Sequence, residues 1–202
     1  MIEVSRGDIW TLTLNRPDKA NALTRDMLSD LADAAEDAAA AKPAALIVTG
    51  RGKVFSAGAD LDAARAGLAT DPVWERLSGA LAALPFPTIA ALNGTLAGGA
   101  FGMALACNMR VSVPGAKFFY PVMALGFLPQ PSDPARLTAL VGPARASMIL
   151  TAGQKVTAQD ALAWGLVDRI ADDPLATAMT LTEAAAKATA KHRAAIKSMI
   201  AG

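Results

Sequence analysis

Two glycine-bearing segments carry the strongest fold signal in this chain: Val54-Phe55-Ser56-Ala57-Gly58-Ala59-Asp60-Leu61 and Ala91-Leu92-Asn93-Gly94-Thr95-Leu96-Ala97-Gly98-Gly99-Ala100. In each segment, glycine stands in a loop between an apolar run typical of a buried strand and a stretch of helical character. Such a turn exposes backbone N–H groups, and the start of the following helix adds partial positive charge beside them. Two such N–H groups converging on one carbonyl oxygen would form an oxyanion hole. Spacing alone leaves open the alternative that both segments are only tight turns.

The residues before the first segment predict a βαβ unit. Residues 10–14 alternate apolar and polar side chains, as a half-covered strand does. A helix with Thr24 as its N-cap continues to about residue 38, and its apolar residues recur every three to four positions. The continuous apolar run at residues 45–48 is typical of a strand covered on both faces.

The same alternation continues towards the C-terminus. The patterns predict a helix over 72–83, a strand over 88–92, a helix from Gly98 to about 108, strands over 111–113 and 117–120, a helix over 158–164 between a Thr157 cap and Gly165, and one helix over 174–200. Four prolines between Pro121 and Pro134 predict an ordered loop without regular structure. We expect an α/β core over residues 1–170 and a C-terminal helical segment over residues 171–202.

Composition excludes several classes of protein. The net charge of +1, from 19 basic and 18 acidic residues, gives no sign of a nucleic-acid groove. Charged residues make up 18% of the chain, below the roughly 25% of an ordinary domain, which favours close packing and buried subunit contacts. Residues 77–109 carry no charge, but Pro85, Pro87 and Asn93-Gly94 interrupt any membrane-spanning helix. We therefore expect no membrane segment.

The few reactive side chains exclude further chemistries. Cys107 is the only cysteine, so no internal disulfide can form, and together with a charged N-terminus this favours a cytoplasmic protein. Ser56 lacks the leading glycine of a nucleophile elbow, because Val54 holds that position. His192 is the only histidine and lies in a basic stretch, so neither a serine triad nor a metal site is expected.

Two further motifs complete the pattern: Leu14-Asn15-Arg16-Pro17-Asp18-Lys19-Ala20-Asn21-Ala22-Leu23, which precedes the first segment, and Ala161-Leu162-Ala163-Trp164-Gly165-Leu166-Val167-Asp168 near the C-terminus. Four motifs in this order, over nearly the whole chain, resemble the crotonase superfamily, the enoyl-CoA hydratase/isomerase family. The resemblance implies an α/β fold with a crotonase-like (ClpP/crotonase) ββα spiral core and a C-terminal helical segment. It also implies acyl-CoA substrates and a homo-oligomer, either a trimer or a dimer of trimers.

The resemblance also implies the positions of the site. The oxyanion donors would be the N–H groups of Ala59 and Gly99. The residues expected to bind substrate are Lys19, Ala20, Ala57, Ala59, Asp60, Leu61, Asp62, Gly98, Gly99 and Gln130. No permanently bound cofactor or metal is implied, because coenzyme A enters as part of the substrate.

Three positions depart from the family pattern. The two glutamates that hydratases use as acid and base correspond to Gly102 and Val122 here, and a third position used by some relatives is the amide Gln130. One positioned acid or base contributes about 10²–10⁴-fold to a rate, so efficient hydration of a 2-enoyl-CoA is not expected. Asp133 and Tyr120 are the candidate replacements; the alternatives are that Asp133 forms a turn or helix cap and that Tyr120 is a packed strand residue.

The sequence therefore leaves three hypotheses. The first is an isomerase or decarboxylase type of acyl-CoA enzyme that stabilises an enolate. The second is a catalytically disabled homologue that acts as an acyl-CoA-binding or assembly subunit, and the third is a purely structural subunit. The chain is also shorter than usual for the family at its C-terminus, where we expect Lys187, Lys191, Arg193 and Lys197 to form a solvated face, or in part to meet a phosphate.

Overall fold

A computed structural model describes residues 1–201 of the chain. Across these residues the strands form two sheets, one of six strands and one of four. The larger sheet runs in the order β1 (Ile2–Ser5), β2 (Ile9–Leu14), β3 (Ala45–Gly50), β5 (Thr88–Leu92), β7 (Met109–Ser112) and β10 (Arg169–Ile170). The smaller runs in the order β4 (Val54–Ser56), β6 (Thr95–Ala97), β8 (Lys117–Phe119) and β9 (Val156–Thr157). Every pairing is parallel except β1 with β2 and β8 with β9.

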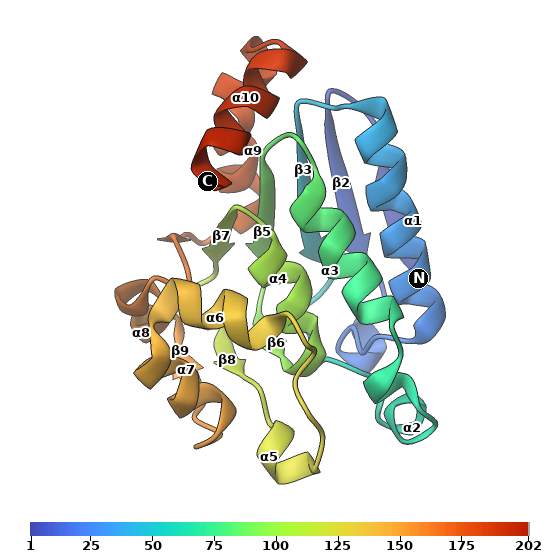
Figure 1. Ribbon diagram of the computed structural model, residues 1–202, viewed down its shortest axis with the longest axis vertical. Helices are drawn as coiled ribbons and strands as arrows, with labels where there is room; N and C mark the ends of the chain where they lie inside the picture. The colour runs from blue at the N-terminus through green and yellow to red at the C-terminus, as the bar shows by residue number, and fades with distance from the viewer. Residues whose placement is uncertain (202) are drawn as a thin grey trace.

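Helices cover both faces of the larger sheet (Figure 1). On one face lie α1 (Arg25–Ala41), α3 (Val73–Ala83) and α4 (Phe101–Ala106), and on the other lies α9 (Pro174–Lys187), which contacts β3, β5 and β7. Side chains alternate between these faces: Leu46 and Val48 enter the main core, while Ile47 packs with Ala178 of α9. The two-sided burial predicted from the apolar run at 45–48 is therefore confirmed.

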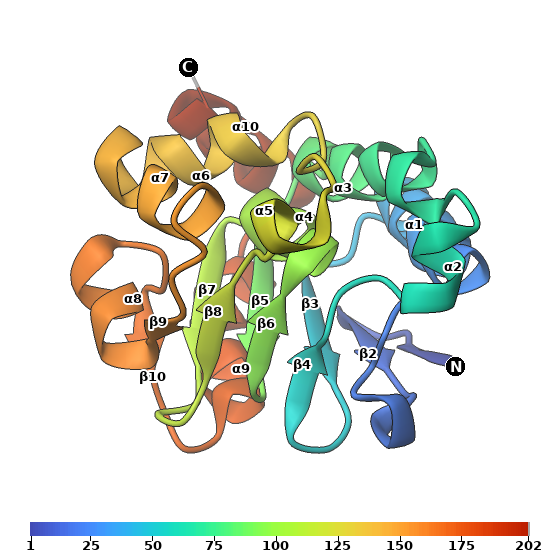
Figure 2. The same ribbon diagram turned by 90° about the horizontal axis from the view of Figure 1, so that it is seen from below.

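Further helices lie around the smaller sheet, which Figure 2 shows beside the larger one. They are α2 (Leu61–Arg65), α5 (Val122–Leu125), α6 (Asp133–Val141), α7 (Pro143–Leu150) and α8 (Ala158–Trp164), with short 3₁₀ turns at Pro17–Lys19, Leu68–Thr70 and Gly98–Ala100. The predicted caps are confirmed: Thr24 accepts a hydrogen bond from the Met27 N–H, and Thr157 accepts one from the Asp160 N–H. No helix within residues 1–201 is both long and apolar enough to cross a bilayer.

Some predicted boundaries were wrong. Residues 121–134 are not wholly irregular, since they contain α5 and the start of α6. The strand β1 was missed, and the single helix predicted over 174–200 is two helices, α9 and α10 (Ala190–Ala201). The break follows the extended conformation of Ala188, and the Thr189 hydroxyl accepts a hydrogen bond from the His192 N–H at the start of α10.

The basic residues of α10 are less solvated than predicted. The Arg193 guanidinium donates to the carbonyl oxygens of Ala185 and Ala188, which lie at the C-terminal end of α9. Lys197 Nζ donates to the Phe86 carbonyl oxygen at 3.0 Å. The prediction of a solvated face was wrong for these two side chains, because free carbonyl groups at a helix end and in a loop attract cationic donors.

Two buried connections carry the chain from the larger sheet into the smaller one. Asn21, which is fully buried, donates through Nδ2 to the carbonyl oxygens of Arg51 and Val54. Asn93 accepts from the Gly50 N–H and donates to the Gly52 carbonyl oxygen. These side-chain amides bond to loop backbone groups that have no strand partner. The two crossings, from β3 to β4 and from β5 to β6, are therefore held side by side.

Glycine is required at one of these crossings. A Cβ atom on Gly94 would lie 2.0 Å from the carbonyl oxygen of Lys53, a contact with backbone that no rotamer change can relieve. Gly79 in α3 offers a matched comparison, because a Cβ there would meet no described atom within 4 Å.

We predict opposite effects for alanine at these two positions. Gly94→Ala lowers the free energy of unfolding by about 1–3 kcal/mol or more, because the two loops must separate. Gly79→Ala raises it by about 0.5–1 kcal/mol, because alanine is the better helix former. Urea denaturation of the two variants beside the parent protein measures both values. Equal effects at the two positions would contradict the close approach at Gly94.

Candidate functional site

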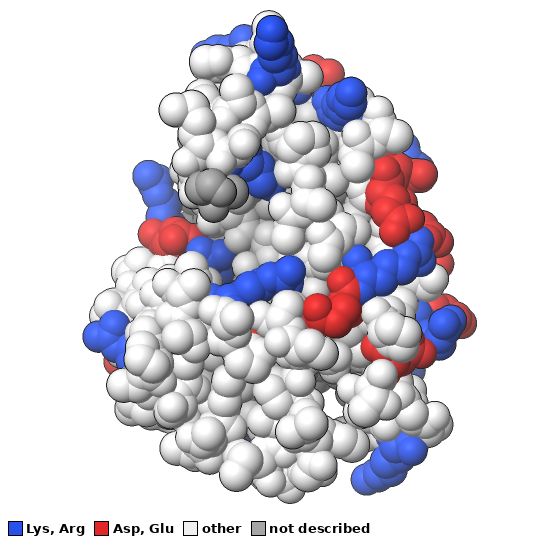
Figure 3. All heavy atoms as spheres, in the orientation of Figure 1, with Lys and Arg blue, Asp and Glu red and all other residues white. Residues whose placement is uncertain are grey.

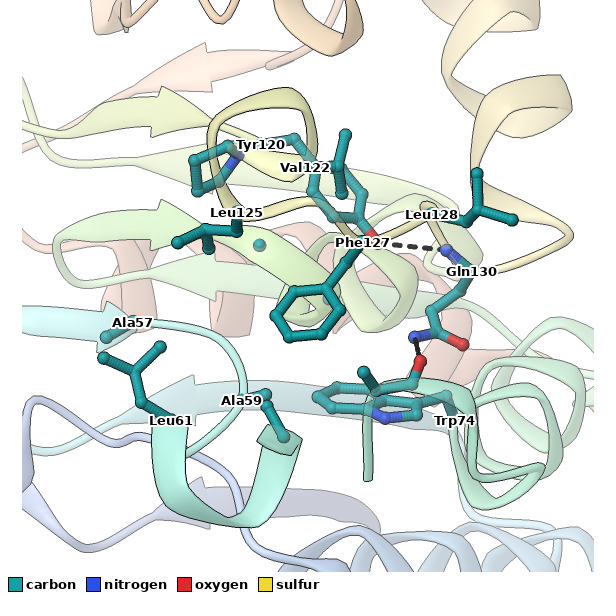
Figure 4. Close-up of a pocket in the computed structure, with 15 residues that line it drawn as sticks. Ala57, Ala59, Leu61, Trp74, Tyr120, Val122, Leu125, Phe127, Leu128 and Gln130 are labelled. Atoms are coloured by element: carbon teal, nitrogen blue, oxygen red, sulfur yellow. Dashed lines mark hydrogen bonds between the residues drawn. The ribbon is translucent and has the colours of Figure 1, made fainter. Parts of the chain in front are cut away.

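A pocket lies where the two glycine turns face the segment around α5 (Figure 4). Its walls are the backbone of residues 57–59 and 98–99, the indole of Trp74, and the apolar side chains of Val122, Leu125 and Phe127. Among its described lining residues, the polar side-chain groups come from Tyr120, Gln130 and Trp74. The indole N–H of Trp74 is already engaged, because it donates to the Leu68 carbonyl oxygen at 2.7 Å. The pocket is thus an apolar slot with few polar atoms.

The backbone N–H of Ala59 points away from Leu23, the residue with which Ala59 forms a bridge. Leu23 forms an isolated parallel bridge with Ala59. In that bridge the Leu23 N–H donates to the Gly58 carbonyl oxygen at 2.8 Å, and the Asp60 N–H donates to the Leu23 carbonyl oxygen at 2.9 Å. Because successive peptide groups of an extended segment point to opposite sides, the N–H of Ala59 points away from Leu23. It finds no protein acceptor within residues 1–201.

The N–H of Gly99 is also free. Gly98 adopts a left-handed conformation, with φ of 56°, and begins the 3₁₀ turn that leads into α4. The first N–H groups of a helix have no partner within it, and the Gly99 N–H finds no backbone acceptor elsewhere in the described chain.

The two turns pack main chain against main chain. A Cβ on Gly58 would lie 2.9 Å from the Ala97 carbonyl oxygen and 3.3 Å from Gly98 Cα. Glycine at position 58 therefore permits a distance that a side chain there would prevent, whereas position 98 favours glycine because of its left-handed conformation. As a result, Ala59 and Gly99 border the same pocket.

Trp74 forms one wall of the pocket, and the helical pattern of the sequence indicates this only indirectly. A Cβ on Gly99 would lie 3.1 Å from Cζ3 of the Trp74 indole, so the ring lies directly against the second turn. Helical spacing places Trp74 on the buried face of α3 together with Val73, Leu77 and Leu81. That pattern identifies a core residue, but it does not indicate which cavity the ring borders.

The residues expected to bind substrate divide into two groups. The structure brings Ala57, Ala59, Leu61, Gly98, Gly99 and Gln130 to the pocket wall. Lys19, Ala20, Asp60 and Asp62 lie outside that wall, although the Ala20 carbonyl oxygen accepts from the Ala57 N–H at 3.0 Å.

Asp60 is engaged in structural contacts. Its carboxylate accepts from the backbone N–H groups of Asp62 and Ala63 at the start of α2 and from the Arg16 guanidinium at 2.9 Å. The hydrogen bond from Arg16 is the main reason that the pKa of Asp60 lies below its usual value. A carboxylate held ionised in this way is a poor proton donor.

Positions 102 and 122, at which the resemblance implies glutamate in hydratases, differ in their surroundings. Val122 contributes an apolar side chain to the pocket wall. Gly102 lies buried in α4, and a Cβ there would be 3.0 Å from Oδ1 of Asp133. The space beside Gly102 is therefore filled by the carboxyl group of Asp133.

Asp133 and Tyr120 form a buried pair. The Tyr120 hydroxyl donates to Oδ2 of Asp133 at 2.9 Å and accepts from the Gln130 N–H at 3.2 Å. Asp133 is only 1% exposed, and its Oδ1 has no hydrogen-bond partner within the described part of the chain. Its side chain does not cap α6, although the residue is the first of that helix.

Burial dominates the protonation of this pair. It raises the pKa of Asp133 to about 7, with a smaller contribution from the negative charge of Glu75. Burial, followed by the charge of Asp133, also raises the pKa of Tyr120, so its phenol stays neutral. A carboxyl group with a pKa near neutrality can exchange protons in either direction.

The chain is similar to known proteins over nearly its whole length. The family model described as enoyl-CoA hydratase/isomerase matches residues 5–201. A probable enoyl-CoA hydratase of Mycobacterium tuberculosis is 35% identical over 172 residues, which cover 84% of this chain and 70% of that protein. A putative enoyl-CoA hydratase/isomerase of Bacillus subtilis is 38% identical over 167 residues, covering 79% of this chain and 64% of that protein.

Solved structures give the same result. An enoyl-CoA hydratase/carnitine racemase from Magnetospirillum magneticum superposes with a TM-score of 0.90 at 31% identity, covering 99% of this chain and 79% of that one. A putative enoyl-CoA hydratase/isomerase family protein from Hyphomonas neptunium superposes with a TM-score of 0.91 at 29% identity, covering 100% and 81% of the two chains. The predicted α/β crotonase-like fold is thereby confirmed, and the chain belongs to the enoyl-CoA hydratase/isomerase family.

Proposed function

We propose that this chain acts on acyl-CoA thioesters by stabilising an enolate between the N–H groups of Ala59 and Gly99. The main support for this proposal is that two unpartnered backbone donors, from two glycine turns in direct contact, border one apolar pocket. A thioester carbonyl placed between them would gain negative charge as the α-proton leaves. Each donor of this kind stabilises such a transition state by about 3 kcal/mol.

Coenzyme A enters this proposal as part of the substrate. The thioester carbonyl of the acyl-CoA is the group that the two donors would hold, and the apolar walls of the pocket suit an acyl chain. The proposed reaction is therefore carried by the chain's own backbone and side chains.

An isomerase or decarboxylase type of reaction fits the site better than hydration. Hydration needs a group that activates water and a group that delivers a proton, and Gly102 and Val122 can do neither. Val122, Leu125 and Phe127 also leave no polar anchor for a water molecule on that wall. A 1,3-proton shift or the protonation of an enolate needs only one proton-transfer group.

A catalytically disabled homologue that binds acyl-CoA is the second candidate. It is favoured by one observation, namely that among the described residues lining the pocket there is no carboxylate. The two candidates differ in turnover and not in binding, so activity measurements separate them.

The surface beside the pocket bears on assembly. Met123, Leu125 and Leu128, in and after α5, are 66%, 50% and 85% exposed. Figure 3 shows few charged side chains over the end of the molecule that carries α5 and α7. These features support the proposal of a homo-oligomer, whose trimeric or hexameric state sedimentation would determine.

One prediction from the proposed function concerns reaction preference. With purified protein, the conversion of a 3-enoyl-CoA to the 2-enoyl-CoA is faster than the hydration of crotonyl-CoA by about 10²-fold or more, the contribution of one missing acid or base. Parallel assays of the two substrates measure the ratio. Rapid hydration would contradict the preference, whereas binding without turnover of any substrate in a broad acyl-CoA panel would favour the disabled homologue.

A second prediction concerns the carbonyl group itself. When hexanoyl-CoA labelled with ¹³C at the thioester carbonyl binds, its carbonyl stretching band moves to lower wavenumber, because two N–H donors polarise the bond. Ala59→Pro removes one donor, which reduces this shift and lowers kcat by about 10²–10³-fold. Ala59→Ser keeps the N–H and is the matched control. A bound ligand whose band does not move in the parent protein would exclude the oxyanion hole.

A further inference from the structure

The proposed oxyanion hole needs a group that takes and returns the substrate proton, and the family's glutamate positions do not supply one. We propose that Asp133, acting through the hydroxyl of Tyr120, is the proton acceptor and donor of this site. The carboxylate of the site thus comes from α6, and not from α4, where the resemblance implies a glutamate at position 102. This inference rests on the proposed function, and it assigns the proton transfer within it.

The contact between Gly102 and Asp133 supports this assignment. A Cβ on Gly102 would lie 3.0 Å from Oδ1 and 3.7 Å from Cγ of Asp133. The carboxyl group therefore occupies the volume that a side chain at position 102 would enter. Glycine within a helix costs about 0.5–1 kcal/mol relative to alanine, and here its absent side chain makes room for Asp133.

The pair is held rigidly beside the pocket. The Tyr120 ring stacks on Phe101 of α4, with ring centres 5.4 Å apart. Its hydroxyl lies between the Gln130 N–H and the Asp133 carboxylate. Figure 4 shows Tyr120 at the pocket with its hydrogen bond to Gln130. Asp133 does not border the pocket, but its hydrogen bond with Tyr120, which does, connects it to the pocket.

The second oxygen of Asp133 is unusual for a purely structural pair. Oδ1 is buried without a partner in the described residues, and Ser78 Oγ, which lies in the same region behind Gly102, also has none. Leaving a buried acceptor unsatisfied costs about 1–3 kcal/mol, so a stable fold gains nothing from this arrangement. A group that must change its protonation state during a reaction does gain from it, because incomplete hydrogen bonding leaves the carboxyl able to hold a proton.

The charges that face Asp133 favour both protonation states near neutral pH. Glu75 of α3 raises its pKa, whereas the Tyr120 hydroxyl and Arg136 of α6 lower it, and burial outweighs both. The carboxylate can therefore accept a proton and return it without a further acid.

The proton transfer balances within this pair. The α-carbon–hydrogen bond of the substrate breaks, and its electron pair forms the enolate whose oxygen is held by Ala59 and Gly99. The released proton bonds to the Tyr120 oxygen while the phenolic proton passes to Oδ2 of Asp133. The reverse transfer delivers a proton to the γ-carbon of an enoyl group, which completes a 1,3-shift. Because burial and the charge of Asp133 raise the pKa of Tyr120, the two transfers occur together and no phenolate accumulates.

Exchange of the α-protons of butyryl-CoA in D₂O tests this inference directly, because it needs an enolate and a base but no further reaction. Proton NMR measures the rate. The parent protein exchanges the α-protons, and Asp133→Asn and Tyr120→Phe each lower the rate by about 10²–10⁴-fold. Calorimetry of butyryl-CoA binding gives an unchanged Kd for both variants, because neither removes a contact to the thioester carbonyl.

The pH profile adds a readout that a structural role would not affect. The exchange rate rises with pH to a plateau, with a midpoint at about 7 as Asp133 loses its proton. Glu75→Gln keeps the plateau and moves the midpoint to lower pH, because it removes a negative charge that raises the pKa of Asp133. The glutamine oxygen can still accept from the Ser132 N–H and hydroxyl, so this variant is the matched control for folding.

The outcomes separate this inference from the proposed function. If the parent protein exchanges the α-protons and both variants match its rate, the relay is overturned while the oxyanion hole stands. If the parent shows neither exchange nor a carbonyl band shift, the proposed function itself is lost. Should Asp133→Asn or Tyr120→Phe fail to fold, a parent profile that is flat across neutral pH, or a midpoint unmoved in Glu75→Gln, overturns the relay.

Discussion

The whole site depends on the contact between two glycine turns. Gly58 allows the main chains of the two loops to meet at a distance that a Cβ atom on it would prevent, and Gly98 supplies the left-handed conformation that begins the second turn. The parallel strands β4 and β6 aim both loops at the same edge of the smaller sheet, and Asn21 and Asn93 hold the crossings that lead to them. The geometry of the proposed oxyanion hole is therefore a property of the backbone, which side-chain substitutions alter only indirectly.

The proposed donors are main-chain groups, so they do not depend on which side chains line the pocket. An oxyanion hole made of N–H groups leaves the surrounding wall free to vary. At position 122 the wall is apolar, and position 102 has no side chain. The space beside Gly102 is filled by Asp133 from a different helix, so the interior is packed there around a buried carboxyl group.

Much of the fold was predictable because its signals are local. Strand and helix periods, the Thr24 and Thr157 caps and the glycine turns depend on residues close in sequence, and these were recognised. Failures occurred where local patterns are weak or misleading. Ala188 breaks a helix that its composition favours, and Arg193 and Lys197 donate to carbonyl oxygens that no helical period reveals.

The sequence by itself determined the family, the α/β architecture, the two turns and the absence of glutamate at positions 102 and 122. It also named Tyr120 and Asp133 as candidates, but only as separate residues. The tertiary structure alone decided that they meet, and that Asp133 lies beside Gly102 in another helix. The physical reason is that hydrogen bonds and packing between distant segments follow from how elements are stacked in space, and no periodic pattern along the chain records that stacking.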